Sequence, residues 1–464
     1  MISAQLEGRD KRPLYEQLYH SIKEAIESGG VKAGDKLPSK RKLADHLQIS
    51  LRTVENAYAQ LALEGYVSSI EKKAYYVQLV ERPRPNTASN QPSRRKPAAS
   101  EVSSDKYAYD LKTNKINRQD FPFSTWTKLM RQSLRDESSA LLEPLHPQGA
   151  QMLRQEISNY LRQFRSMNVT ADQVIVGAGT EYLLGLVTEL LKGRVFAIEE
   201  PNYHKPALIF QSRGVRFSSI SLDREGLCVD ELDRSEASAA LITPSHHFPL
   251  GTVMSVTRRM RLLQWAAQKE DRYLIEDDYD SEYRFNLKPV PPLHSLDQHD
   301  KVIYLNTFTR TLAPSLRIAY LVLPPALLAL YRRKLLFYAC TVSAVEQCTL
   351  GKFMKEGYYE RHLNRIRNIY KIRRDALLKG LEPLSGVIST RGREAGLHLL
   401  LTSDKGLPEE EMIRRAADQG VRVYGLSGFY LKNARRTSTV IAGYAGYERD
   451  DLQKAASLLL KAWQ

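Results

Sequence analysis

The sequence has few cysteines and no long uninterrupted apolar run. Its three cysteines, Cys228, Cys340 and Cys348, are scattered through 464 residues, too few for a disulfide framework or a thiolate metal site. They favour a reducing compartment. The apolar stretch "AYLVLPPALLAL" is broken by two prolines, and the N-terminus lacks the apolar core of a signal peptide. The sequence therefore predicts a soluble, cytoplasmic protein with no membrane partner.

Acidic residues are outnumbered by basic ones. The chain carries 68 Lys and Arg against 53 Asp and Glu, a formal net charge of +15, which favours an acidic partner, with nucleic acid the first candidate. Hydrophobic residues make up 42% of the chain, so a large core can form and the protein is globular. At this length the chain exceeds one ordinary core, and at least two domains are expected.

A segment rich in proline, serine and arginine divides the chain. The stretch "ERPRPNTASNQPSRRKPAASEVSSD" has no apolar period of either 2 or 3.6 residues, which is typical of a linker. The expected organisation is a small domain at 1–80, a flexible linker at 81–106 and a large body at 107–464.

The first 80 residues show the apolar periodicity of three short helices and a hairpin. Serine or proline precedes the second and third helices, and glycines follow the first. The apolar positions are Leu14, Leu18, Ile22 and Ile26 in the first helix, Leu43, Ala44 and Leu47 in the second, and Val54, Ala57, Tyr58 and Leu61 in the third. The hairpin is predicted from alternation at Tyr66, Ser68 and Ile70, then at Tyr75 and Val77, around a charged turn.

The short gap between the second and third helices is typical of a helix-turn-helix. The third helix would then present Arg52, Thr53, Asn56 and Gln60 to the major groove of DNA, where arginine reads guanine edges and phosphate contacts hold the register. A small helical dimerisation or adaptor domain is the alternative that periodicity alone leaves open.

The order of these motifs resembles the winged helix-turn-helix of GntR-type transcription regulators. The specific parts are "G-x-x-L-P-S-x-R-x-L-A" and "S-x-x-T-V-x-x-A-Y-x-x-L-x-x-E-G". The wing turn "EKKAYYV" lacks the glycine usual in the family. The resemblance implies DNA contacts by these side chains: Arg41, Arg52 and Thr53, with Lys40 and the wing lysines Lys72 and Lys73 near phosphates.

Two stretches of the body combine a short apolar strand with polar residues at its end. In "DQVIVGAGTEYLL" a glycine-rich loop leads into a helix, an arrangement that can bind phosphate or simply pack tightly. In "RYLIEDDYDSEYRF" acidic residues and a tyrosine follow a buried strand, where open α/β sheets bind ligands. A solvated acidic loop is the alternative there.

Taken in order, these stretches resemble the fold-type I aminotransferases that carry pyridoxal 5'-phosphate, and more closely the aminotransferase-like domain of MocR/GabR-type regulators. Further stretches that carry the resemblance are "EEPNYHKP", "TPSHHFPLGTVMS", "NTFTRTLAPSLRIAY" and "EAGLHLLL". The expected fold class is an N-terminal winged helix-turn-helix (α+β) linked to an α/β aminotransferase-like domain. The resemblance implies a homodimer bound to double-stranded operator DNA and responding to a small amino compound.

The resemblance also implies roles for single residues. Asp277 would pair with the pyridine nitrogen, Tyr279 would bond the ring oxygen and Tyr203 would stack near the ring. The phosphate-binding residues would be Gly179, Thr180, Thr307 and Arg317. Thr309 and Arg310 are counted with the cofactor-binding residues. The candidate contacts of an effector carboxylate would be Lys205 and Arg435 or Arg436.

One departure from the aminotransferase pattern concerns the residue that forms the covalent bond with the cofactor. The family segment reads roughly "T-F-S-K-x-L-x-P-x-x-R", whereas this chain has Thr309 and Arg310 in place of Ser-Lys. The family lysine forms an internal aldimine with the cofactor. Arginine stays protonated with delocalised lone pairs, so it cannot replace that amine. The sequence therefore predicts no catalytic residue, no internal aldimine, and pyridoxal phosphate held non-covalently or as an external aldimine.

Three hypotheses remain open from the sequence. The first is a regulator whose body senses the cofactor, an amino compound or their adduct. The second is an active aminotransferase with a DNA-binding appendage, and the third is a ligand-independent DNA-binding protein whose body is a scaffold. His247 and Leu250 stand where related regulators commonly show Gln and Thr, so a change of ligand is also open.

Overall fold

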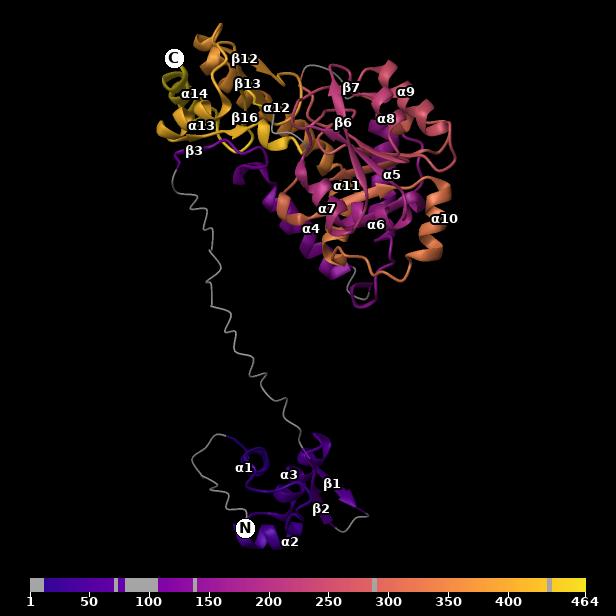
Figure 1. Cartoon of the computed structure of the whole chain (residues 1–464), viewed down its shortest axis with the longest axis vertical. Coiled ribbons are helices and arrows are strands. Elements are labelled where there is room, and N and C mark those ends of the chain that lie inside the picture. Colours follow the sequence, from indigo (N-terminus) through magenta and orange to yellow (C-terminus); the bar gives the residue numbers. More distant parts are fainter. Residues whose placement is uncertain (1–11, 71–73, 80–106, 137–139, 286–289, 432–435) are drawn as a thin grey trace. The chain divides into compact units, whose positions relative to one another are not determined.

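The computed structural model describes residues 12–70, 74–79, 107–136, 140–285, 290–431 and 436–464. The chain separates into two compact units, Met1–Glu101 and Val102–Gln464 (Figure 1). None of the helices in these described ranges is long and apolar enough to cross a membrane.

The N-terminal unit is a three-helix cluster with a two-stranded antiparallel sheet. Its elements are α1 (Leu14–Glu27), α2 (Lys40–Leu47), α3 (Leu51–Leu63), β1 (Val67–Ile70) and β2 (Ala74–Val77). The side-chain oxygens of Ser39 and Ser50 accept hydrogen bonds from the first turns of α2 and α3, so serine caps fix where both helices begin. The buried core is formed by Leu18, Ile22, Ile26, Leu37, Leu43, Val54, Ala57, Tyr58, Leu61, Val67 and Val77.

Two details of this unit differ from the sequence prediction. Leu14 is 42% exposed, because it is the first residue of α1 and no neighbouring element covers it. In β1 the buried residue is Val67, which pairs with Val77 of β2, whereas of the predicted Tyr66, Ser68 and Ile70 the first two are half-buried and the side chain of Ile70 lies outside the description. A strand of four residues gives too short a pattern to fix its phase without its partner.

The large domain of the second unit is built on an eight-stranded sheet. Neighbouring strands from β10 through to β6 run parallel, whereas β11 is antiparallel to both of its neighbours and β7 to β6. In spatial order the strands are β4 (Val174–Ala178), β11 (Ile318–Val322), β10 (Val302–Thr307), β9 (Tyr273–Asp277), β8 (Ala239–Ile242), β5 (Phe196–Glu200), β6 (Phe217–Asp223) and β7 (Gly226–Leu227). The strands β8, β10 and β11 inside the sheet are buried along their length, as expected for a sheet covered on both faces.

Helices connect these strands and cover the sheet. They are α4 (Phe123–Asp136), α5 (Gln151–Arg165), α6 (Thr180–Leu190), α7 (His204–Ser212), α8 (Val229–Arg234), α9 (Val256–Ala267), α10 (Pro325–Lys334) and α11 (Ala344–Lys355). Three apolar clusters lie against the sheet, one centred on α6, one on α5 and α11, and one on α8 and α9. This arrangement fixes the positions of the strand ends.

The small domain has a four-stranded antiparallel sheet and three helices. The strands are β12 (Ile388–Arg391), β13 (His398–Ser403), β16 (Thr439–Gly443) and β15 (Tyr424–Gly425), and the helices are α12 (Tyr358–Leu381), α13 (Glu409–Asp418) and α14 (Arg449–Trp463).

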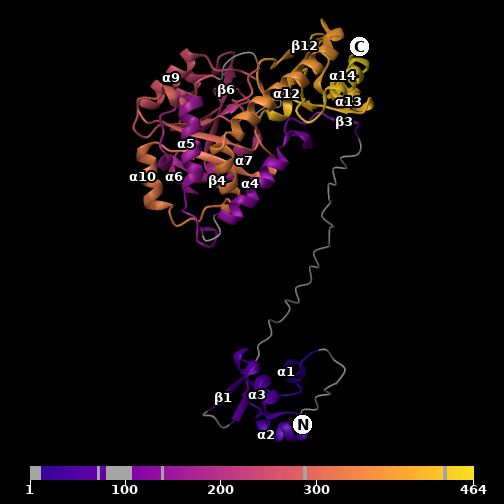
Figure 2. The ribbon, with the colours of Figure 1, turned by 180° about the vertical axis from the view of Figure 1, so that it is seen from behind.

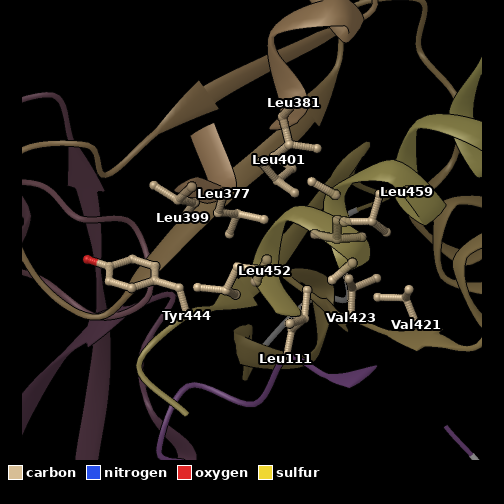
Figure 3. Packing of buried hydrophobic residues seen from close by; sticks show 14 of the residues in the cluster. Leu111, Leu377, Leu381, Leu399, Leu401, Val421, Val423, Tyr444, Leu452 and Leu459 are labelled. Carbon is tan, nitrogen blue, oxygen red and sulfur yellow. The ribbon is translucent and has the colours of Figure 1, made fainter. Parts of the chain in front are cut away.

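The first ordered strand after residue 106 belongs to this small domain. The strand β3 (Tyr109–Asp110) pairs in parallel with β14 (Val421–Arg422), and it lies beside α13 in both views of the ribbon (Figures 1 and 2). Leu111 follows it and packs against Leu452 and Val423 in the domain core (Figure 3). The segment that enters the body is therefore part of the C-terminal fold.

Candidate functional site

Five strands end at one edge of the large sheet and bring polar residues together there. Asp277 ends β9 and Thr307 ends β10, while Gly179 directly follows β4. Because β11 runs antiparallel, its first residue lies at the same edge, and Arg317 precedes it. Thr243 follows β8 in the same way. Open α/β sheets bind ligands at this edge.

A cavity of about 550 Å³ opens at this edge, bounded by both domains of the body. Gly179 adjoins the cavity, because a Cβ built on it would collide with the guanidinium of Arg317. Arg436 is exposed and is not among the lining residues, while Arg435 lies outside the described residues. The predicted residues that line the cavity are Thr180, Tyr203, Lys205, Asp277, Tyr279, Thr307, Thr309, Arg310 and Arg317.

One end of the cavity has the donors of an anion site. Gly179 has a φ of 89° and Thr180 begins α6, so backbone N–H groups and the helix dipole point to this end. Thr307 Oγ1 donates to Thr309 Oγ1 at 2.7 Å. Arg317 adds a guanidinium held by Glu181. This donor set fits a phosphate group.

Glu181 holds two cations at this end. Its carboxylate accepts from Lys205 Nζ at 2.6 Å and pairs with Arg317. Burial alone would raise the pKa of Glu181, but the hydrogen bonds from the two cations outweigh it and lower the pKa to about 2. Lys205 therefore lies with the phosphate-binding groups in this structure, next to the ring of Tyr203, whose centroid is 5.8 Å from its Nζ.

Asp277 is the acidic group of the cavity floor. Its Oδ1 is buried and has no hydrogen-bond partner in the part of the chain that the structure describes. Burial, then the neighbouring charges of Asp278 and Asp280, raise the pKa of Asp277 to about 7. An unpartnered acid in such a place fits a protonated ring nitrogen, which would pair with the carboxylate and lower its pKa.

Replacing Asp277 with asparagine tests this buried acid without any ligand. Because the folded pKa lies above the unfolded one, its stabilising contribution is full at low pH and is lost as pH rises through about 7. Between pH 5 and pH 8 the wild-type protein should lose about 2 kcal/mol more free energy of unfolding than Asp277→Asn. Urea unfolding at pH 5 and at pH 8 measures the free energy of unfolding of both proteins. An equal loss of that free energy in the two proteins would contradict the burial of an ionisable Asp277.

Tyr279 presents a hydroxyl that remains protonated. Burial and the charge of Asp280 raise its pKa well above the usual range. Its Oη lies 3.3 Å from Nδ1 of His246, and that nitrogen is 2.9 Å from Asp280 Oδ2. A hydroxyl fixed in this way is available to donate to an oxygen on a bound ring. Tyr203 is 45% exposed at the cavity and stands edge-on to Phe248.

Arg310 reaches into the cavity between the two domains. Its Nη1 donates to the carbonyl oxygen of Thr113 at 2.9 Å, and its guanidinium lies 5.8 Å from the ring centroid of Tyr279. The carbonyl of Arg310 accepts from Tyr283 Oη at 2.7 Å. The positive charge lowers the pKa values of Asp277 and Tyr279, although burial outweighs that effect.

His247 and Leu250 lie beside the cavity and do not line it. His247 is buried with its Nε2 3.7 Å from Glu199 Oε2. Burial lowers the pKa of His247 to about 3 and raises that of Glu199 to about 7, so His247 is neutral near pH 7, where Glu199 changes its charge. The difference from related regulators at His247 and Leu250 therefore affects residues that support the cavity wall, and not the lining itself.

Sequence reasoning missed more than half of the cavity wall. Several of the missed residues come from the small domain or from the segment after β3, far from the strand ends in sequence. Glu181 had a local signal, since it directly follows the glycine loop. The missed residues that the arguments below use are Thr113, Glu181, Asn202, Phe248, Tyr424, Phe429 and Ile441, together with Lys112.

The predicted DNA contacts lie on α2 and α3 of the N-terminal unit. Arg41 and Arg52 are exposed. Thr53 Oγ1 is 2.8 Å from the capping hydroxyl of Ser50. Lys40 Nζ lies 3.4 Å from Glu55 Oε1. Such a surface ion pair is weak, so it leaves Lys40 available for the predicted phosphate contact. Lys72 and Lys73 of the wing turn lie outside the described residues.

Comparisons with known proteins agree with both units. Residues 109–458 match the family model "Aminotransferase class I and II", and residues 14–77 match "Bacterial regulatory proteins, gntR family". The chain is 37% identical over 454 residues to YdeL, an uncharacterized HTH-type transcriptional regulator of Bacillus subtilis (strain 168), covering 97% of both chains. It is 31% identical over 469 residues to the probable rhizopine catabolism regulatory protein MocR of Rhizobium meliloti, covering 97% of this chain and 94% of that one.

Solved structures support the fold of the body. A multiple substrate aminotransferase from Thermococcus profundus has a TM-score of 0.68 at 24% identity, with 78% of this chain and 92% of that chain covered. The body therefore has the fold-type I aminotransferase architecture, a fold that binds pyridoxal phosphate. The chain belongs to the MocR-type family of HTH transcriptional regulators, in which a gntR-family domain precedes an aminotransferase class I and II domain. It is a DNA-binding regulator, and the predicted winged helix and aminotransferase-like fold are confirmed.

Proposed function

We propose that this regulator senses pyridoxal phosphate, an amino compound or their adduct without covalent attachment and without transamination. The observation that carries the proposal is Arg310 in a cavity that otherwise has groups for a phosphate, a ring nitrogen and a ring oxygen. The two relatives named above are HTH-type or regulatory proteins, which agrees with a sensing role.

Different residues of the cavity would bind different groups of the cofactor. Thr180, Thr307 and Arg317 would bind its phosphate, Asp277 its ring nitrogen and Tyr279 its ring oxygen. The bound cofactor supplies an aldehyde that condenses with amines. Arg310 stays protonated at every accessible pH and its nitrogen lone pairs are delocalised, so it contributes charge and hydrogen bonds and no nucleophile.

A titration of the purified full-length protein with pyridoxal phosphate tests the proposal. Absorbance should change to saturation, dialysis should remove the cofactor, and borohydride treatment should leave no cofactor on the chain in intact mass spectra. Cofactor fixed to the protein by borohydride, or turnover of an amino acid with a keto acid, would favour the active aminotransferase. Absence of any binding would leave the body as a scaffold or as the receptor of another ligand.

The DNA-binding surface is tested by Arg52→Ala. Arg52 is exposed at the start of α3, and losing an arginine that reads a base edge should cost about 1–3 kcal/mol of binding free energy. Fluorescence anisotropy would use DNA that the wild-type protein selects from a random-sequence pool. Lys32→Ala, an exposed cation in the loop before α2, is the matched control. Equal loss in both variants would place base recognition elsewhere.

A homodimer would present two recognition helices and favour a repeated or inverted half-site. Three consecutive apolar residues after α10 support this: Leu336, Phe337 and Tyr338 are 37%, 75% and 41% exposed, a cluster that a partner would cover. Phe337→Asp should shift the full-length protein toward monomer in light scattering after size exclusion. Leu208→Asp, at 58% exposure on α7, is the control, and an unchanged mass for Phe337→Asp would move the interface off this cluster.

A further inference from the structure

The charged groups of the cavity are concentrated around the cofactor-binding positions. Four cationic side chains of the described residues line the cavity, and of these Lys205 and Arg317 are held by Glu181. Arg310 is held by the carbonyl oxygen of Thr113. The fourth, Lys112, is exposed, so water screens its charge.

The wall that the small domain supplies is apolar. Tyr424 and Ile441 are cross-strand partners on β15 and β16, so their side chains share one face of the sheet. Phe429 completes this wall, and its ring stands edge-on to Phe248 at a centroid distance of 5.1 Å. Ile441 is fully buried in a cluster with Leu400. The small domain thus gives the cavity aromatic and aliphatic carbon.

Polar atoms of this wall already make hydrogen bonds within the protein. The hydroxyl of Tyr424 donates to Asp110 Oδ1 at 2.7 Å. The carbonyl oxygen of Phe429 accepts from the backbone nitrogen of Asn202 at 2.9 Å. A carboxylate pressed against these residues would lose its water and gain no partner in exchange, which is unfavourable. An apolar group in the same place would leave water and pack against carbon.

We infer that the amino compound sensed by this cavity is an amine with an apolar, aromatic or branched aliphatic free end and no carboxylate beside the nitrogen. This inference rests on the proposed binding of pyridoxal phosphate and adds the class of its amine partner. The phosphate and the ring would occupy the polar end and the floor, and the tail of the amine would lie on Tyr424, Phe429 and Ile441.

Two stable probes that differ by one group test the inference. They are N-(5'-phosphopyridoxyl)-2-phenylethylamine and N-(5'-phosphopyridoxyl)-L-phenylalanine, secondary amines made by reduction, which share the phosphate, the ring and the phenyl tail. Titration calorimetry with the full-length protein should show at least about tenfold tighter binding of the probe without the carboxylate, because the other buries an unpaired charge.

Variants of the wall make the comparison specific. Phe429→Ala removes a half-buried ring, and it should weaken the phenylethylamine probe severalfold more than it weakens pyridoxal phosphate itself. Phe164→Ala, at 45% exposure on α5 and outside the cavity lining, is the matched control. Ile441→Arg supplies a partner for a carboxylate and should reverse the preference between the two probes.

The outcomes separate the two proposals. Equal or tighter binding of the phenylalanine probe overturns the inference about the amine. Binding of pyridoxal phosphate without binding of either probe also overturns it, since the cavity would then take the cofactor alone. Failure of pyridoxal phosphate and both probes overturns the proposed function and this inference with it.

Discussion

Arg310→Lys is expected to convert the cavity from reversible to covalent cofactor binding. A buried lysine near the cations of the phosphate site has a lowered pKa, so a free amine is available to attack the cofactor aldehyde. The wild-type guanidinium cannot do so. Incubation with pyridoxal phosphate followed by borohydride should therefore label most chains of the variant and none of the wild type, as measured by intact mass spectrometry and peptide mapping to residue 310.

Two controls make this result decisive. Arg310→Met keeps a long side chain without charge, and it should bind the cofactor non-covalently and more weakly than the wild type, because the guanidinium charge is lost. Label on another residue, for example Lys205, would show that reaction occurs outside the predicted position. An unlabelled Arg310→Lys protein that still binds cofactor would mean that residue 310 does not face the aldehyde, and the assignment of the family's lysine position to Arg310 would be wrong.

Arg165→Met is expected to cost about 3–5 kcal/mol of unfolding free energy, because it leaves a buried carboxylate without its cation. Arg165 on α5 pairs with Asp278, and both side chains are almost completely buried. Asp278 also accepts from Tyr304 Oη at 2.6 Å and Ser281 Oγ at 2.9 Å. These contacts hold the residue next to Asp277 in place, so the floor of the cavity should loosen together with the fold.

The control for this prediction lies on the same helix. Arg162 is exposed on α5, and Arg162→Met should change stability by no more than about 0.5 kcal/mol. Urea unfolding followed by circular dichroism compares the two variants at one pH. A loss for Arg165→Met as small as that for Arg162→Met would show that the ion pair contributes little beyond its own desolvation.

Local patterns in the sequence predicted the N-terminal unit well. Leu18, Ile22 and Ile26 repeat at helical spacing, and Ser39 and Ser50 mark helix starts, so each helix is encoded within about a dozen residues. The prediction missed Val67, the buried residue of β1, which pairs with Val77 across the hairpin. That pairing depends on the register of two strands, which neither strand contains alone.

The part of the cavity on the large sheet was also predictable. Asp277, Thr307 and Arg317 each sit at the end of an apolar run, and the sheet topology brings such ends together. The resemblance to aminotransferases gave these residues their order and roles. Their assignment to phosphate and ring remains a prediction, which the titrations above test.

The remaining wall could not be predicted because it depends on tertiary structure. Thr113 and Ile441 are separated by most of the chain, and they meet at the cavity only because β3 joins the small domain. Nothing in the residues around Ile441 distinguishes it from an ordinary core position. The predicted effector contact at Arg435 or Arg436 stays a prediction, since Arg436 does not line the cavity and Arg435 lies outside the described residues.

The placement of β3 has a mechanical consequence. Tyr109 donates to the carbonyl of Gly420, Leu111 donates to that of Arg422 and accepts from Gly443, and the residues that follow line the cavity. Tension arriving along the chain from the DNA-binding unit would load these hydrogen bonds together in shear, since β3 and β14 run parallel. The described part of the body therefore begins on the small domain, so a force that reached β3 along the chain would act on the small domain before it acted on the large sheet.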